Sequence, residues 1–184
     1  MCIVLIVGDR MDWLDFKEFM LDSIKFIIAF IILLVLMVYV VSITQVVGNS
    51  MYPNLKNQDV LLLNKAKYRF FDVERGDLIS FTYEDTKYLI KRVIGLPGDT
   101  IQIKDNQVYI NGEKYQEDYI ENKETEDFDI SELGYEKVPR GMYFVLGDNR
   151  SNSMDSREIG FVSKDQIIGE VALRFWPLNK IKFY

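Results

Sequence analysis

The sequence contains no histidine and a single cysteine, and each shortage excludes a class of protein. With Cys2 as the only thiol among 184 residues, no disulfide can form within the chain. Without histidine there is no Ser-His-Asp triad and no Cys-His pair, and a catalytic zinc site is disfavoured because histidine is a principal zinc ligand. We therefore expect no metal and no cofactor, and any general base must be Asp, Glu, Lys, Tyr or an amine.

The sequence also has no concentration of basic residues. Its formal net charge is −6, from 22 Lys and Arg against 28 Asp and Glu, and the two signs are interspersed. A nucleic-acid-binding surface needs a basic patch or stripe, so we expect no nucleic acid among the partners.

One long apolar run lies near the N-terminus. From Phe26 to Val41 every residue is apolar or aromatic, and from Ile24 to Ile43 the run has the length of about 20 residues that crosses a bilayer as a helix. A cleavable signal peptide has a shorter apolar region that ends in small residues, unlike Ser42-Ile-Thr-Gln45. We interpret the run as a retained anchor, with a transmembrane helix at 24–44 and the lipid bilayer as a partner.

The basic residues that flank this run predict its orientation. Three precede it, namely Arg10, Lys17 and Lys25, whereas the first one after it is Lys56. The positive-inside rule then predicts a single-pass protein of the cell membrane, with a cytoplasmic segment at 1–23 and residues 45–184 outside the cytoplasm. Because the first ten residues are apolar and isolated, either Met1 or Met11 can be the start of translation.

The pattern of residues 45–184 is that of a β-rich domain. Short alternating runs predict strands at 59–64, 78–82, 88–94, 101–104, 107–110, 142–146 and 171–175. Asp105-Asn106 predicts a two-residue hairpin turn. Long helical periodicity is absent, so we predict a mainly β fold built on an antiparallel sheet. The acidic stretch 113–136 predicts an excursion from the core, and we expect about 105–140 to form a small inserted subdomain or loop.

Two segments carry candidate catalytic groups. In Gly48-Asn-Ser-Met-Tyr-Pro-Asn-Leu55, Ser50 lies on a constrained, non-helical loop, and in Tyr88-Leu-Ile-Lys-Arg-Val-Ile-Gly-Leu-Pro-Gly-Asp99, Lys91 interrupts an apolar strand. If Lys91 is buried, desolvation lowers its pKa, and the neutral amine can then take a proton from a serine hydroxyl. Each residue also has an ordinary interpretation, a simple turn for Ser50 and a solvated strand position for Lys91.

A third segment, Gly147-Asp-Asn-Arg-Ser-Asn-Ser-Met-Asp-Ser-Arg157, is dense in hydroxyls, amides and paired charges. Its ordinary interpretation is a polar surface loop with Asx turns. Its functional interpretation is a loop that orients the base, in which Ser153 hydrogen-bonds the lysine and Asp155 pairs with Arg157 or Arg92.

These segments, together with the anchor and Arg75-Gly-Asp-Leu-Ile-Ser-Phe81, closely resemble the type I bacterial signal peptidases over residues 46–177. The matching motifs are long and specific: Gly-x-Ser-Met-x-Pro-x-Leu, Lys-Arg-Val-Ile-Gly-Leu-Pro-Gly-Asp and Gly-Asp-Asn-Arg-x-x-Ser-x-Asp-Ser-Arg. The resemblance implies that Ser50 is the nucleophile and Lys91 the general base, with Ser153 beside the lysine. It implies that three further residues are supports, namely Arg92, Asp155 and Arg157.

The resemblance also implies the subgroup and the activity. The single anchor, the short chain and Gly48 point to the Gram-positive type, in which glycine leaves the oxyanion hole without the hydroxyl that larger relatives can carry there. The implied activity is that of a membrane-anchored serine endopeptidase. It removes N-terminal signal peptides from secretory preproteins, cutting after small residues by a Ser/Lys acyl-enzyme mechanism.

Two groups of apolar side chains have implied or open roles. By resemblance, the pockets for small residues are walled by Val46, Met51, Leu89 and Ile90. Four aromatic residues form either an apolar edge at the membrane or part of the core: Tyr52, Phe70, Phe71 and Trp176. Two competing interpretations are a soluble Ser/Lys autoprotease of the repressor type and a catalytically inactive, membrane-tethered binding module.

Overall fold

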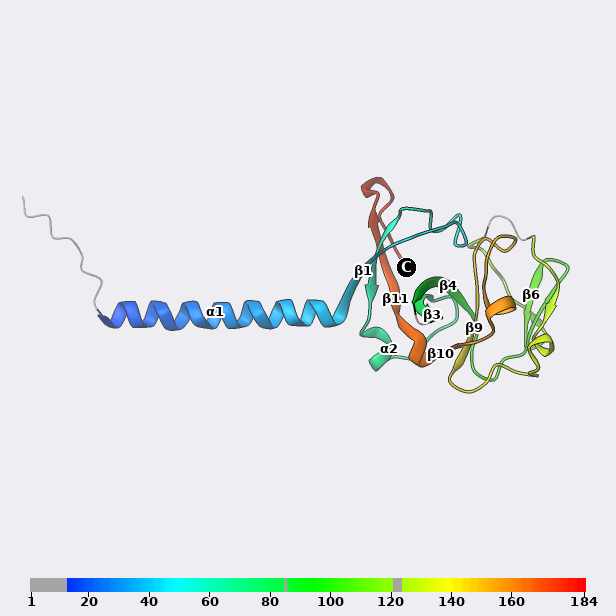
Figure 1. Ribbon diagram of the computed structural model, residues 1–184, viewed down its shortest axis with the longest axis horizontal. Coiled ribbons are helices and arrows are strands. Elements are labelled where there is room, and N and C mark those ends of the chain that lie inside the picture. Colours follow the sequence, from blue (N-terminus) through cyan, green and yellow to red (C-terminus); the bar gives the residue numbers. More distant parts are fainter. Residues whose placement is uncertain (1–12, 85, 121–123) are drawn as a thin grey trace, which may run out of the picture. The chain divides into compact units, whose positions relative to one another are not determined.

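The computed structural model describes residues 13–84, 86–120 and 124–184 (Figure 1). The chain divides into two units, Met1–Tyr39 and Val40–Tyr184. The two candidate starts of translation, Met1 and Met11, lie outside the described residues.

In the first unit the structure describes one long helix, α1 (Trp13–Val40), whose last residue already belongs to the second unit. This helix is long and apolar enough to cross a membrane. The large apolar side chains that are described for this helix are exposed, and they point in all directions around its axis. The predicted span at 24–44 differs from the helix at both ends, because α1 begins earlier and Val41–Gln45 forms strand β1. Pairing of β1 with β2 (Val60–Asn64) satisfies the backbone of these five residues, so the helix ends at Val40.

The second unit is built around one large antiparallel sheet with the strand order β1-β2-β11-β3-β4-β9-β10, and β12 pairs with β11. Its remaining strands are β3 (Leu78–Tyr83), β4 (Lys87–Gly95), β9 (Met142–Leu146), β10 (Val162–Ser163), β11 (Ile167–Trp176) and β12 (Lys182–Phe183). The sheet brings β4 beside both β3 and β9, although long stretches of sequence separate β4 from β9.

A smaller antiparallel sheet has the order β7-β6-β5-β8. It contains β5 (Ile101–Lys104), β6 (Gln107–Ile110), β7 (Glu113–Lys114) and β8 (Phe128–Asp129). Asp105 and Asn106 join β5 to β6 with φ of 50° and 61°, as a two-residue hairpin turn with positive φ requires. The predicted hairpin is therefore confirmed, while the boundary of a subdomain at about 105–140 stays a prediction.

The helices of the second unit are short. They are α2 (Lys67–Phe70), α3 (Ser156–Ile159) and the 3-10 turns η1 (Ile130–Leu133), η2 (Lys164–Gln166) and η3 (Leu178–Lys180). The predicted fold class, mainly antiparallel β with one N-terminal apolar helix, is confirmed.

Buried side chains form three apolar clusters that hold the sheets together. Alternation along β4 sends neighbouring residues into different clusters, since Leu89 packs beside Phe81 and Val93 while Ile90 packs beside Met51 and Leu78. The third cluster joins β5 and β6 to β9. The strand that carries the candidate base is thus fixed by packing on both faces.

Candidate active site

The loop that carries Ser50 follows β1 and is held from two sides. Gly48 has a φ of +94°, a left-handed conformation that glycine adopts without strain, and its N–H donates to Asn57 Oδ1 at 3.0 Å. The backbone N–H of Asn149 donates to the Ser50 carbonyl oxygen at 3.0 Å, and the Asn149 side chain donates to the Asn49 carbonyl at 3.1 Å. The loop that starts at Gly147 therefore fixes the backbone of the serine.

Lys91 lies on β4 with its Nζ 2.6 Å from Ser50 Oγ, within hydrogen-bond distance. The residue is only 2% exposed. Burial disfavours the ammonium and lowers the pKa of Lys91 to about 8, although the carboxylates of Asp155 and Asp148 act in the opposite direction. A substantial fraction of neutral amine at mildly alkaline pH is what a general base for a serine hydroxyl requires.

Asp155 braces the loop behind this pair. The residue is fully buried and caps the N-terminus of α3. Its carboxylate accepts hydrogen bonds from the Gly147 N–H at 2.9 Å and from Arg157 Nε at 2.9 Å. Arg157 also donates to the Arg150 carbonyl, so the predicted Asp155–Arg157 pair ties both ends of the loop together.

Ser153 and Ser50 meet at Gly147. A methyl group on Gly147 would lie 2.1 Å from Ser153 Oγ and 2.6 Å from the Ser50 carbonyl oxygen, so only glycine permits this approach. Ser153 Oγ is buried and has no hydrogen-bond partner in the part of the chain that the structure describes. The expected hydrogen bond from Ser153 to Lys91 is therefore not formed in this structure, and a supporting role of Ser153 stays a prediction.

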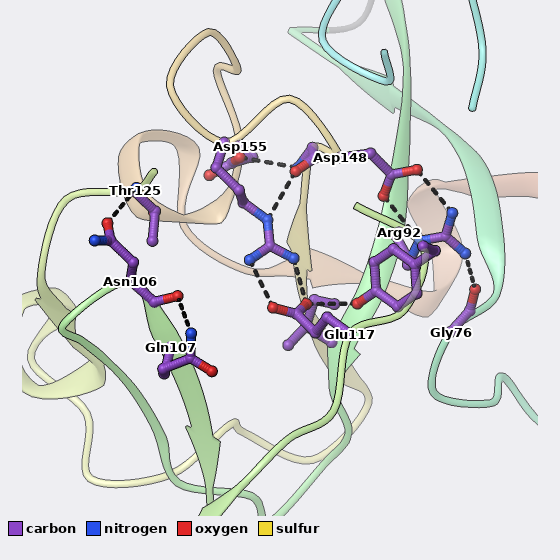
Figure 2. A network of polar contacts seen from close by, with 12 residues as sticks. Gly76, Arg92, Asn106, Gln107, Glu117, Thr125, Asp148 and Asp155 are labelled. Carbon is purple, nitrogen blue, oxygen red and sulfur yellow. Dashed lines mark hydrogen bonds and ion pairs between the residues drawn. The ribbon is translucent and has the colours of Figure 1, made fainter. Parts of the chain in front are cut away.

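Arg92 pairs with Asp148, a residue that we did not predict as its partner (Figure 2). Its Nε and Nη2 donate to the two carboxylate oxygens of Asp148 at 2.8 and 2.7 Å, and its Nη1 donates to the Gly76 carbonyl at 2.9 Å. Of the two alternative partners for Asp155, Arg157 is therefore the observed one and Arg92 is not. Alternation along β4 points Arg92 to the face opposite Lys91, where its guanidinium meets Asp148, whereas the carboxylate of Asp155 is held by Arg157 and the Gly147 N–H.

Residues outside the predicted set complete this network (Figure 2). Arg150 and Glu117 form a buried ion pair, and Arg150 Nε donates to the Gly147 carbonyl at 3.0 Å. The Tyr119 hydroxyl donates to Glu117 at 2.5 Å, and its ring lies 4.0 Å from the guanidinium of Arg92. The carboxylate of Glu117, from the acidic stretch, is thus buried against the loop that starts at Gly147, which composition alone did not indicate.

The four side chains expected to wall the substrate pockets do not form one cluster. Val46 and Met51 are buried together, with Ile90 packed against them, while Leu89 belongs to the cluster on the other side of β4. The structure thus brings three of the four together beside the Ser50 loop, and the role of all four in binding stays a prediction.

The four aromatic residues with open roles are exposed rather than part of the core: Tyr52, Phe70, Phe71 and Trp176. Among the described residues, no group of three or more His, Cys, Asp or Glu side chains lies together in a way that could hold a metal ion.

Comparison with known proteins gives a consistent family. The family model described as "Signal peptidase, peptidase S26" matches residues 20–176. Signal peptidase I T of Bacillus subtilis (strain 168) is 42% identical over 142 residues, covering 73% of this chain and 74% of that protein. Signal peptidase I of Bacillus caldolyticus is 39% identical over 165 residues, covering 85% and 91%. Signal peptidase IB of Staphylococcus aureus (strain MRSA252) is 34% identical over 180 residues, covering 91% and 94%.

Among solved structures, the crystal structure of a signal peptidase I from Enterococcus faecalis V583 is 39% identical to this chain. The match has a TM-score of 0.49 and covers 54% of this chain and 96% of that structure.

Proposed function

This chain belongs to the signal peptidase family, peptidase S26, of the Gram-positive type, and from that premise we propose that it is a membrane-anchored serine endopeptidase that removes signal peptides from secretory preproteins. The observation that carries the proposal is the 2.6 Å separation of Lys91 Nζ and Ser50 Oγ at a buried position. A serine alone is a weak nucleophile, and an adjacent base activates it.

In the proposed acylation step, the neutral amine of Lys91 accepts the proton of Ser50 Oγ while that oxygen attacks the scissile carbonyl carbon. The resulting ammonium of Lys91 then donates its proton to the leaving amine, which releases the mature protein and leaves the signal peptide as an ester on Ser50. Lys91 next removes a proton from water, the hydroxide attacks the ester, and Ser50 Oγ takes the proton back.

The oxyanion of each tetrahedral intermediate needs hydrogen-bond donors. The backbone N–H of Ser50 is one candidate, since it makes no hydrogen bond within residues 13–84, 86–120 and 124–184. Gly48 contributes no side-chain donor to such a hole. Donors of this kind are each worth about 10²–10³-fold in rate, so the backbone geometry of this loop carries a large share of the proposed catalysis.

Selection of small residues before the cut is proposed to come from the apolar wall beside the serine. Val46, Met51 and Ile90 lie together there, and Leu89 lines the other face of the same strand. A bound signal peptide would extend along β4 by adding a strand, and alternate side chains would then face the wall.

Membrane anchoring is proposed for α1, with the bilayer crossed by the helical part of the predicted span, residues 24–40. The flanking basic residues favour a cytoplasmic N-terminal segment and an extracytoplasmic peptidase domain at 45–184. This arrangement would place the peptidase on the side of the membrane to which preproteins are exported.

The test is cleavage of a purified preprotein by the full chain in reconstituted membranes. Ser50→Ala and Lys91→Ala should each abolish cleavage, whereas two matched controls should remain active: Ser151→Ala, an exposed serine of the neighbouring loop, and Lys87→Ala, an exposed lysine of the same strand. Because the substrate is a separate chain, cleavage also distinguishes this activity from self-cleavage. Full activity in both Ser50→Ala and Lys91→Ala would refute the proposal.

A further inference from the structure

A basic cavity lies beside α2, in the second unit and outside the candidate active site. It has a volume of about 310 Å³, and its lining includes Lys65, Arg69 and Lys164 together with Tyr68 and Asp165. Three cations against one carboxylate give it a local positive charge, although the formal net charge of the chain is −6. Such a cavity attracts anions.

Two of these cations, Arg69 and Lys164, are exposed and can reach a ligand. Arg69 is exposed and makes no ion pair within the described part of the chain. Lys164 Nζ faces Asp72 at 3.7 Å, but the two side chains are 44% and 98% exposed, so the contact is weak. Lys67 of the same helix differs, because it is bound by Asp77 and Glu170 and lies outside the cavity lining.

Two large exposed aromatic side chains follow the cavity residue Arg69 along the chain. Phe70 is 79% exposed and Phe71 is 68% exposed, and they follow Arg69 directly in the sequence. Cations beside exposed aromatic rings are typical of surfaces that lie at the interface between lipid headgroups and acyl chains.

The backbone connects this segment to the end of α1. The Lys65 N–H donates to the carbonyl oxygen of Val40, the last residue of the helix, at 2.8 Å, and Val41 pairs with Asn64. The turn that leads into α2 is therefore bonded to the residue at which the proposed membrane helix ends. If α1 crosses the bilayer, this turn lies close to the headgroups.

We propose that the cavity binds the phosphate of an anionic phospholipid, with Phe70 and Phe71 inserted beside it at the membrane interface. This inference rests on the proposed anchoring by α1. The guanidinium of Arg69 can donate two parallel hydrogen bonds to the phosphate, and Lys164 adds a point charge. The contact fixes how the domain sits on the bilayer, and with it the height of Ser50 above the membrane surface.

The test uses the full chain reconstituted into vesicles of phosphatidylcholine, with or without about 30 mol% phosphatidylglycerol. Cys2, the only cysteine, is replaced by serine, and Phe71→Cys carries an environment-sensitive fluorophore. We expect a blue shift of its emission that depends on phosphatidylglycerol. In Arg69→Gln/Lys164→Gln the affinity for the anionic lipid should fall by roughly tenfold or more, since each basic residue near an anionic surface contributes to binding. The blue shift should then largely vanish.

The matched control is Lys104→Gln/Lys114→Gln, which removes the same charge from exposed positions on the smaller sheet and should keep the full shift. An equal shift in Arg69→Gln/Lys164→Gln would overturn the inference. The same shift produced by inorganic phosphate in pure phosphatidylcholine would overturn the lipid assignment in favour of free phosphate.

Two further measurements separate this inference from the proposed function. Release of the chain from the vesicles by alkaline carbonate would refute the membrane anchor, and the inference with it. Hydrolysis of a short soluble signal-peptide substrate should be equal in wild type and in Arg69→Gln/Lys164→Gln. An inactive wild type that still shows the lipid-dependent shift would refute the proposed function alone.

Discussion

Lys91 Nζ lies 2.6 Å from Ser50 Oγ while the lysine side chain is almost entirely buried. The short distance permits direct proton transfer, and the burial makes the neutral amine accessible near neutral pH, since it lowers the pKa of Lys91 to about 8. Packing on both faces of β4 fixes the position of Lys91 relative to Ser50 and also buries the lysine.

The first prediction concerns the pH dependence of cleavage. Below about pH 8 the amine of Lys91 becomes protonated, so kcat/KM should fall about tenfold for each pH unit. Lys87→Gln, which changes an exposed lysine of the same strand, should show the same fall of kcat/KM below about pH 8. A rate that stays constant between about pH 6 and 9 would remove Lys91 as the base.

The second prediction concerns stability, because a buried ammonium is costly. The pKa of Lys91 is lower in the folded chain, about 8, than its ordinary value of 10.5, so the unfolded chain binds more protons between these values. The free energy of unfolding therefore rises with pH across this window, and the full cost of the buried charge is present below it.

Lys91→Met should consequently be more stable than wild type at pH 7, by at most about 3 kcal/mol, while it loses activity. The difference should shrink as the pH rises from 8 towards 10.5, as measured by urea denaturation. Lys104→Met, at an exposed position, provides the control. If the difference in free energy of unfolding between Lys91→Met and wild type is the same at pH 8 and at pH 10.5, burial of the Lys91 ammonium is not costly.

The third prediction concerns the close approach at Gly147. In Gly147→Ala the new methyl group would collide with Ser153 and with the Ser50 carbonyl. Displacement of the serine by about 1 Å should lower kcat by at least about 10²-fold, and overpacking should cost about 1–3 kcal/mol of stability.

Gly95→Ala is the matched control for this variant. Its methyl group would lie 2.9 Å from both Ile101 Cδ1 and Phe144 Cβ, which form part of the core that joins the two sheets. It should therefore lose stability without a comparable loss of kcat in the folded fraction. Equal effects of both variants on kcat would show that Gly147 has no special role at the serine.

The sequence predicts most of the strands well, because alternation and turn residues are local patterns, and it also singles out Ser50 and Lys91 by their segments. Alternation and turn residues locate the hairpin around Asp105-Asn106 with the observed bounds of both strands. The absence of histidine, together with the segments around Ser50 and Lys91, indicates two groups that the structure brings within hydrogen-bond distance.

The sequence is less informative where partners come from different strands and loops. Arg92 has carboxylates available at both Asp148 and Asp155, and only the face of β4 on which it lies selects Asp148. Nothing in the sequence distinguishes Glu117 from its exposed acidic neighbours. Its burial against Arg150 depends on the path of the chain between β7 and β8. The end of α1 at Val40 likewise depends on the pairing of β1 with β2.

The last prediction concerns this buried ion pair. In Glu117→Gln the shape of the side chain is kept, but the guanidinium of Arg150 remains buried without a countercharge, which typically costs about 3–5 kcal/mol. Since Arg150 also binds the Gly147 carbonyl, the loop behind Ser50 should become less ordered and kcat should fall.

A double-mutant cycle measures the coupling directly. Glu117→Gln/Arg150→Met removes both charges, so it should be destabilised by less than the sum of the two single variants. Glu113→Gln, an exposed residue of the same acidic stretch, should change the free energy of unfolding by less than about 0.5 kcal/mol. Additive single effects in the cycle would mean that the acidic stretch does not brace the loop through this pair, and that the order of the Ser50 backbone depends on Asn149 and Asp155 instead.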